Sequence, residues 1–162
     1  MKVFEINKTQ FIEKPIEKVF DFFSKPENLE KITPKYLAFN IISSLPIKMK
    51  KGKIIDYTIR LLKFRVHWRT LITSYEPPYL FIDEQIKGPY KFWHHTHTFE
   101  SKNGGVEITD KVRYAIPFGW LGWILNFFWI RPDLEKIFNY RKDIIQKYFD
   151  NINKEDKGES NK

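Results

Sequence analysis

Apolar and polar positions alternate along much of the chain, a pattern typical of β-strands with one buried face. The alternation occupies residues 2–12 and returns after residue 39. Turn-forming residues interrupt it at Pro46, Gly52, Pro77-Pro78, Gly88-Pro89 and Asn103-Gly104. The pattern predicts one strand over residues 2–12 and six more over residues 39–44, 54–61, 64–75, 79–86, 92–101 and 106–116. Short turns between consecutive strands predict an antiparallel meander.

Two short helices are predicted after the first strand. Pro15 suits the first turn of a helix, and the next residues place one apolar face at i, i+3, i+4 and i+7. These residues are Ile16, Val19, Phe20 and Phe23. Ser24 and Glu27 then form a capping-box pattern, which predicts a second helix to about Ile32.

A long amphipathic helix is predicted to begin at Pro132 and to carry Arg141 within its apolar stripe. The last residues, 151–162, are polar and charged and predict a disordered tail, which leaves residues 1–150 as a single domain. A sheet of this size must bury its inner face against the one long helix. We therefore expect an α+β fold in which about seven curved antiparallel strands wrap around a C-terminal helix and enclose a cavity.

Composition adds an aromatic excess to this picture. Of the 162 residues, 17% are aromatic, namely 15 Phe, 8 Tyr and 5 Trp, which is more than packing alone requires and suits the lining of a pocket. The chain has no cysteine, which excludes disulfides, thiol nucleophiles and cysteine zinc sites. The polar N-terminus shows no secretory signal, so a cytoplasmic location is expected.

The net charge of +8 raises the question of an anionic partner. Only Lys48, Lys50, Lys51 and Lys53 cluster, beside Gly52, and the other lysines are scattered. Because the chain shows no reading helix or known nucleic-acid module, no nucleic-acid partner is expected. We expect a monomer or a weak homodimer, with peripheral membrane contact as an open possibility.

Four segments resemble a known superfamily. The run KPIEKVFDFF at residues 14–23 resembles the first-helix signature of the SRPBCC, or START-like, helix-grip superfamily, which includes lipid-transfer domains and polyketide cyclases. PENLEKITP at residues 26–34, DEQIKGPY at 83–90 and WHHTHTF at 93–99 resemble its ligand-binding SRPBCC subgroup, which is polyketide cyclase/dehydrase-like. The resemblance spans about residues 3–149 and implies a helix-grip fold. It implies no catalytic set, because the superfamily carries transport, sensing, cyclisation and hydrolysis on one scaffold.

The strand predicted over residues 92–101 carries three of the four histidines. If Asn103-Gly104 forms a two-residue turn, Lys102 pairs with Gly105 and the register of the hairpin follows. It pairs His97 with Asp110, His95 with Val112, Trp93 with Tyr114, and Phe99 with Ile108. This face is the more apolar one, so His95, His97, Asp110 and Tyr114 are expected to project into the cavity.

Three interpretations of this cluster stay open. In the first, which we favour, Asp110 accepts a hydrogen bond from His97 and the cluster only orients a ligand head group. In the second, His97 is a general base oriented by Asp110, with His95 or Tyr114 as proton donor. The His-x-His spacing also suits a metal, with Asp110 as oxygen ligand, but a third convergent ligand is needed, so no metal and no cofactor is expected.

Two further sites leave alternatives. Pairing across Pro77-Pro78 turns Asp83 and Gln85 inward, whereas pairing across Gly88-Pro89 turns Glu84 inward; we therefore expect a bulge and one acid in the cavity. Arg141 either snorkels at the helix edge or enters the cavity to bind an anionic group.

The segment over residues 118–129 is too apolar for a plain loop. It contains Trp120, Trp123 and Trp129. It could close the cavity as a lid, pack against the end of the sheet, or dock on a membrane or a second subunit.

The expected function is binding of a small hydrophobic molecule with a polar head, such as a lipid, polyketide or isoprenoid, for transport, sequestration or sensing. The residues expected at the ligand are Trp68, Trp93, His95, His97, Phe99, Asp110, Tyr114, Arg141, Trp120 and Trp123. The alternatives are a cofactor-independent cyclase, dehydratase or hydrolase that uses His97, Asp110 and His95, and a membrane-docking or partner-binding module that uses residues 118–129. A binding protein is favoured over an enzyme.

Overall fold

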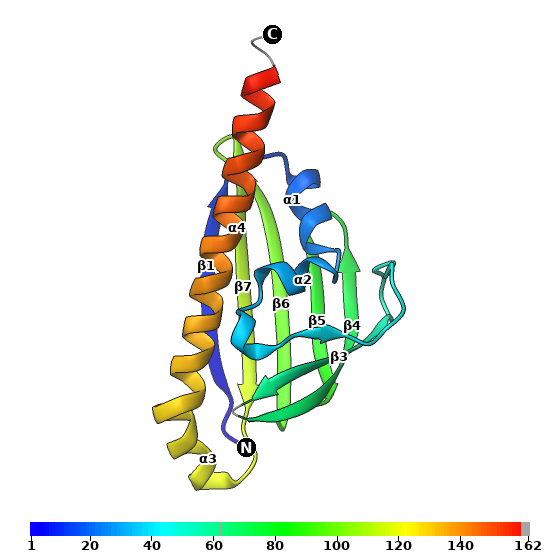
Figure 1. Cartoon of the computed structure of the whole chain (residues 1–162). Helices are drawn as coiled ribbons and strands as arrows, with labels where there is room; N and C mark the ends of the chain where they lie inside the picture. Colours follow the sequence, from blue (N-terminus) through cyan, green and yellow to red (C-terminus); the bar gives the residue numbers. More distant parts are fainter. Residues whose placement is uncertain (62, 160–162) are drawn as a thin grey trace.

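A computed structural model describes residues 1–61 and 63–159, in which seven strands form one antiparallel sheet (Figure 1). The strands are β1 (Phe4–Ile12), β2 (Asn40–Ile41), β3 (Ile54–Leu61), β4 (Phe64–Glu76), β5 (Leu80–Lys87), β6 (Phe92–Lys102) and β7 (Gly105–Ala115). Their order is β1-β7-β6-β5-β4-β3-β2, so β2 to β7 form a meander and β1 pairs with β7. The predicted seven-stranded antiparallel sheet is confirmed.

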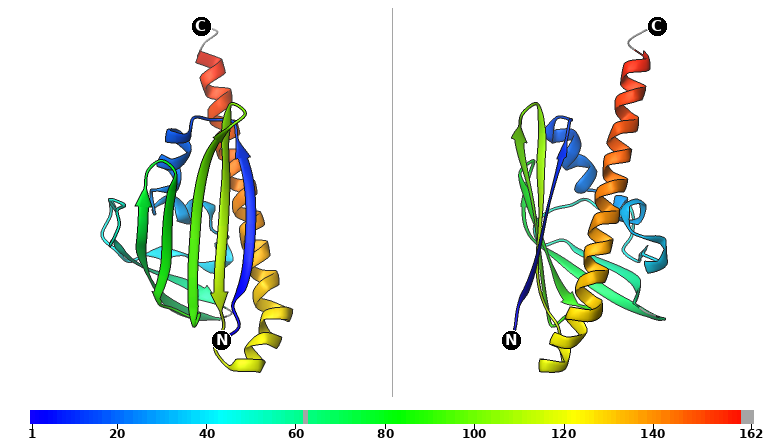
Figure 2. Two further views of the ribbon diagram at one scale, coloured as in Figure 1. Left: turned by 180° about the vertical axis from the view of Figure 1, so that it is seen from behind. Right: turned by 90° about the vertical axis from the view of Figure 1, so that its left-hand side faces the viewer.

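The helices lie on one side of this sheet. The short helices α1 (Ile16–Phe23) and α2 (Asn28–Ile32) follow β1 as predicted, and a 3-10 turn that the sequence did not predict, η1 (Lys35–Leu37), comes after them. Figure 2 shows α4 (Arg131–Glu159) running along the face of the curved sheet, with α1 on the same side. The predicted α+β helix-grip architecture is confirmed. None of the described helices is both long and apolar enough to cross a membrane.

The last helical segment begins earlier than Pro132, which corrects the predicted start. Helix α3 (Gly119–Leu125) and a π-helical turn, η2 (Asn126–Ile130), lead directly into α4. A proline lacks the N–H that an inner helical position donates, and the wide turn just before Pro132 lets the chain continue without it. The tail predicted over residues 151–162 overlaps α4 up to Glu159, and residues 160–162 lie outside the described residues.

The register between β6 and β7 follows from their turn. Asn103 and Gly104 both have positive φ, 50° and 80°, as a two-residue type I′ turn requires. Lys102 pairs with Gly105, and His97 consequently pairs with Asp110. Every pair predicted for this hairpin is confirmed.

The pairing of β5 resolves which acid faces inward. Asp83 pairs with Ile72 on β4 and with His95 on β6, whereas Glu84 pairs with His94 and points to the outer face. Of the two alternatives left open by the sequence, the one that turns Asp83 inward, opposite Ile72, is therefore confirmed, and the one that turns Glu84 inward is not. A bulge was expected in this region. The register between β4 and β5 shifts in two places, between Arg69 and Thr70 and between Ile72 and Ser74.

Candidate functional site

A cavity of about 170 Å³ lies between the inner face of the sheet and the helices. This is roughly ten times the space that one buried water needs. Most side chains in its wall are apolar or aromatic, among them Tyr57, Trp68, Trp93, Leu134 and Phe138. The polar side chains used below are Thr70, Asp83, His95, His97, Asp110 and Arg141. The cavity therefore suits a small, mostly apolar molecule with one polar end.

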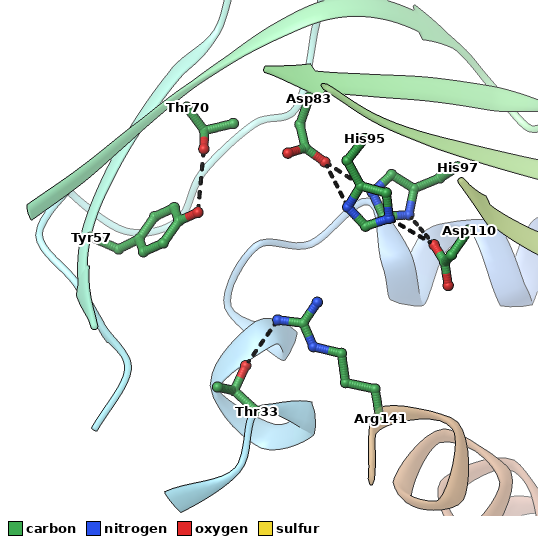
Figure 3. A network of polar contacts seen from close by, with 8 residues as sticks. All are labelled: Thr33, Tyr57, Thr70, Asp83, His95, His97, Asp110 and Arg141. Carbon is green, nitrogen blue, oxygen red and sulfur yellow. Dashed lines mark hydrogen bonds and ion pairs between the residues drawn. The ribbon is translucent and has the colours of Figure 1, made fainter. Parts of the chain in front are cut away.

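Two histidines and two aspartates in the wall contact one another in a closed ring (Figure 3). His97 Nε2 donates to Asp83 Oδ2 over 2.9 Å, and His95 Nε2 donates to Asp110 Oδ1 over 3.2 Å. The Nδ1 atoms make ion-pair contacts that lack hydrogen-bond geometry. These join His97 to Asp110 over 2.7 Å and His95 to Asp83 over 3.4 Å. Each imidazole thus bridges the same two carboxylates.

The sheet register places these four residues together. Adjacent strands β5, β6 and β7 present them at directly paired positions, Asp83 with His95 and His97 with Asp110. Along β6 the two histidines separate Trp93 from Phe99, which belong to different apolar clusters of the core. A polar group at such a position costs free energy unless it has a partner, and here each histidine has two.

The two histidines differ in protonation. Burial opposes the charged form of His97, but the charges of Asp110 and Asp83 outweigh it and raise the pKa of His97 to about 9. Burial lowers the pKa of His95, and the neighbouring charge of His97 lowers it further. Burial opposes the charged form of each carboxylate, but the contacts with His95 and His97 outweigh it and hold the pKa of Asp83 and of Asp110 below the usual range. At neutral pH the ring therefore contains two carboxylates, one imidazolium and one neutral imidazole.

Arg141 faces this ring from α4 (Figure 3). Its Nη2 donates a long bond of 3.5 Å to Thr33 Oγ1, and its guanidinium lies 5.5 Å from the ring centre of Phe138. Among the described residues, no carboxylate forms an ion pair with it within 4.0 Å. Burial lowers the pKa of Arg141, yet an arginine stays charged at neutral pH. With Arg141 and His97 positive and Asp83 and Asp110 negative, the formal charges of this wall sum to zero.

Tyr57 and Thr70 form a second polar point that the sequence did not single out. The Tyr57 hydroxyl lies 3.3 Å from Thr70 Oγ1, and burial raises the pKa of Tyr57, so the phenol stays neutral. Both residues lie on the inner face of paired strands, since Ile55 pairs with Thr70 and Tyr57 with Trp68. The alternation of residues along β4, in which Trp68 and Thr70 share one face, could have indicated that Thr70 faces the cavity.

Six of the ten residues expected at the ligand line the cavity. They are Trp68, Trp93, His95, His97, Asp110 and Arg141. Asp83 joins them as the inward acid whose identity the sequence left open. For Arg141 the structure places the side chain in the cavity wall.

The other four are placed elsewhere, which corrects the expectation. Tyr114 is fully buried and its hydroxyl donates to Asn126 Oδ1 over 2.8 Å, so it is not positioned to donate a proton to a ligand. Phe99 packs against Phe20 and Phe23 of α1. Trp120 and Trp123 lie on the outer surface, because α3 turns these side chains to solvent. The segment over residues 118–129 is therefore not a lid over the cavity.

Three groups in the ring could hold a metal ion. The donor atoms of Asp83, His95 and His97 all lie within 4.8 Å of one another. The carboxylate is Asp83 and not Asp110, which instead contacts the opposite ring nitrogens. A cation here would have to replace the direct bond between His97 and Asp83 and the proton that His97 carries, because a metal binds neutral imidazole.

Comparison with known proteins gives the family. The family model for polyketide cyclase/dehydrase and lipid transport matches residues 12–133. None of the curated proteins compared with the chain matches it.

Solved structures share the fold at low sequence identity. Protein Ms6760 from Mycobacterium smegmatis is 13% identical, with a TM-score of 0.66 over 91% of this chain and 92% of that one. Major latex-like protein 151 from Panax ginseng is 9% identical, with a TM-score of 0.64 over 91% and 97%. The di-domain ARO/CYC StfQ from the steffimycin biosynthetic pathway is 10% identical, with a TM-score of 0.70 over 92% of this chain and 51% of that one. By its fold and by the match of the family model, the chain belongs to the polyketide cyclase/dehydrase and lipid transport family.

Proposed function

We propose that the chain binds a hydrophobic molecule with a polar head group in its cavity, for transport, sequestration or sensing. The observation that carries this proposal is the position of Arg141. It brings a charged guanidinium to the wall of a mostly apolar cavity, where no described carboxylate lies within ion-pair distance. A desolvated charge without an ion-pair partner is unfavourable, and an acceptor on a bound molecule relieves it.

The ring of His95, His97, Asp83 and Asp110, which faces Arg141, limits which head groups can bind. The four contacts of the ring use one oxygen of each aspartate, Asp83 Oδ2 and Asp110 Oδ1, which leaves the other oxygens to a bound molecule or to water. A head group that accepts from Arg141 and donates to an aspartate fits both sides. An enol, a phenol or a protonated carboxylic acid has this property, and polyketides, isoprenoid quinols and fatty acids carry such groups. The aromatic wall favours a flat or unsaturated skeleton.

The test is to identify the bound molecule and measure what holds it. Native mass spectrometry of protein purified from its own host, followed by extraction, should show one class of amphipathic molecule in the wild type. The Arg141→Ala variant should bind that molecule at least tenfold more weakly, the size of a lost charge-assisted hydrogen bond. Lys147→Ala, on the exposed side of the same helix, is the matched control and should bind as the wild type does. A consistently empty cavity, or equal affinity of Arg141→Ala, would contradict the proposal.

A second candidate function is proton transfer to the bound molecule. It is favoured by the opposite pKa shifts of the two histidines, upward for His97 and downward for His95. Neighbouring groups whose pKa values are shifted in opposite directions provide an acid and a base in one site. In this scheme His97 is the acid and His95 the base, the reverse of the roles that the sequence suggested, and the reaction class is cyclisation or dehydration without a cofactor.

Turnover separates the two functions. The extracted molecule is incubated with fresh protein and followed by mass spectrometry for loss of water, and by its absorbance spectrum for a cyclisation that leaves the mass unchanged. A catalytic role requires conversion by the wild type and its loss in His95→Asn, while His95→Asn still binds the molecule. Unchanged molecule after prolonged incubation would leave binding as the function.

A further inference from the structure

The end of the molecule formed by α3 and η2 exposes an unusual amount of apolar surface. We call the exposed residues Phe118, Trp120, Leu121, Trp123, Phe127, Phe128 and Trp129 the aromatic end. Trp120 is 77% exposed and Trp129 66%, although tryptophan is largely buried in most folded domains. Globular domains rarely expose a patch of this size unless it binds something.

The aromatic end lies at one extremity of the fold. Figures 1 and 2 show α3 beyond the edge of the sheet, beside the N-terminus and far from the C-terminal end of α4. Lys2 confirms this neighbourhood, because its Nζ lies 5.4 Å from the ring centre of Trp123. Met1, also exposed, adds an apolar side chain at the same end of the chain. An extremity of the fold can enter a soft partner such as a lipid layer.

We infer that the aromatic end inserts into the head-group layer of an anionic lipid bilayer. Tryptophan is enriched at this layer because its ring is apolar and its N–H still finds a hydrogen-bond partner there. Helix α3 is too short to cross a bilayer, so it would lie in the interface. This inference does not depend on the identity of the molecule in the cavity.

Charge complementarity selects the lipid over a second copy of the chain. Residues 111–132 contain no aspartate or glutamate, and their charged residues are Lys111, Arg113 and Arg131. Lys111 contacts Glu5 and Arg131 contacts Glu135, so these two charges are partly balanced. Lys2 lies against the aromatic end, and the whole chain carries +8. Two copies packed through this end would bring the positive charges of Lys2 and Arg113 toward their counterparts, whereas an anionic membrane would attract them, by about 1 kcal/mol for each basic residue near the surface.

Docking in this way would bring the cavity close to the membrane. Asp133 and Leu134, which follow η2 at the start of α4, both line the cavity. A bilayer is the phase in which hydrophobic molecules of the proposed class dissolve. The aromatic end would then hold the protein where its ligand is found.

The inference is tested by flotation of the full chain with lipid vesicles. We expect the wild type to float with vesicles of phosphatidylcholine mixed with phosphatidylserine, and to float less with phosphatidylcholine alone or at high salt. The double variant Trp120→Ser/Trp129→Ser should lose at least tenfold in vesicle partitioning while keeping the Tm of the wild type, because both side chains are exposed. Tyr79→Ser removes another exposed aromatic residue, 62% exposed, from the turn between β4 and β5 and should float as the wild type does.

A charge variant keeps the test independent of the double variant. Lys2→Glu should weaken flotation with the phosphatidylserine vesicles and leave the weaker flotation with phosphatidylcholine unchanged. A wild type that floats with neither kind of vesicle would overturn the inference, as would a double variant that floats as well as the wild type. Sedimentation of the lipid-free protein identifies the other occupant: a wild-type dimer that the double variant abolishes, without vesicle binding, would assign the aromatic end to a second copy of this chain.

Discussion

The rings of His95 and His97 lie with their centres 3.7 Å apart, and each ring contacts both Asp83 and Asp110. Two positive charges at this separation would repel each other strongly, so the pair holds one proton charge between its two rings near neutral pH. The two macroscopic protonation steps belong to the pair as a unit. This relationship between the two histidines determines the pH behaviour of the site.

The first prediction concerns the titration of the histidine pair. One histidine should titrate near pH 9, since the pKa of His97 is raised to about 9, and the other below the ordinary value near 6.5, since burial and the charge of His97 lower the pKa of His95. NMR signals of the ring carbon-bound protons measure both steps. Asp110→Asn should lower the upper step, because Asp110 is the main group that raises the pKa of His97. Two steps close to 6.5 would contradict the prediction.

The second prediction is that the unfolding free energy falls on both sides of about pH 6.5. Above it, the unfolded chain has lost the His97 proton that the folded chain keeps up to about pH 9, so stabilisation of roughly 3 kcal/mol at most is lost as pH rises through that range. Below it, the unfolded chain protonates the His95 position and the folded chain does not, so stability falls again. Urea unfolding across pH tests this. Stability that rises from pH 6.5 to 9 would contradict it.

The third prediction concerns the carboxylates of the ring. Asp110→Asn leaves the imidazolium of His97 with one counter-ion and should destabilise the protein by about 3 kcal/mol, as breaking a buried ion pair does. Glu84→Gln, on the outer face one residue from Asp83, should change stability by less than about 0.5 kcal/mol. Urea unfolding of both variants measures the difference. Similar losses in the two variants would show that the ring contributes little.

The fourth prediction is that Arg141 lowers stability in the absence of a ligand. Arg141→Met keeps the apolar stem and removes a desolvated charge that has no described ion-pair partner, so it should raise the unfolding free energy by about 1 kcal/mol while it weakens ligand binding. Lys147→Met, at an exposed position of the same helix, should have little effect. Lower stability of Arg141→Met would instead assign Arg141 a structural role.

The fifth prediction separates two neighbouring glycines. Gly104→Ala meets no atom within 4 Å, so its cost comes only from the positive φ of 80° and should be about 1 kcal/mol. Gly105→Ala places its Cβ 2.5 Å from the backbone oxygen of Ile12 and should cost more, because backbone cannot move aside cheaply. Thermal unfolding ranks the two. The reverse order would show that the pairing of β1 with β7 yields easily.

The sheet and most of the ring could be predicted because they depend on local rules. Strand alternation fixes the face of each residue, and the turn at Asn103-Gly104 sets which residues are opposite each other, so the approach of His97 to Asp110 followed. The inward direction of Asp83 was harder to predict, because the turns at the two ends of β5 predicted opposite faces of the sheet for this residue. The irregular pairing of β4 with β5 decides between them, and no residue pattern marks it.

Tertiary context accounts for the failures. Tyr114 lies on the inner face, as alternation predicts, but its hydroxyl donates to Asn126 of η2. That contact depends on a helical turn before Pro132, where the sequence predicted no helix. Trp120 and Trp123 suggested a lining because apolar residues usually face inward. Both side chains are exposed instead, so a prediction that places apolar residues inside the fold was wrong for them.

The hairpin of β6 and β7, with β5 beside it, also bears on how the chain folds. All four members of the ring lie within residues 83–110, on three consecutive strands joined by short connections, so their contacts close only small loops. Arg141 reaches the cavity only when α4 docks, after a long stretch of chain has been ordered. If the short loops close first, the four members of the ring would pair while water still surrounds them, and α4 would cover charges that already have partners.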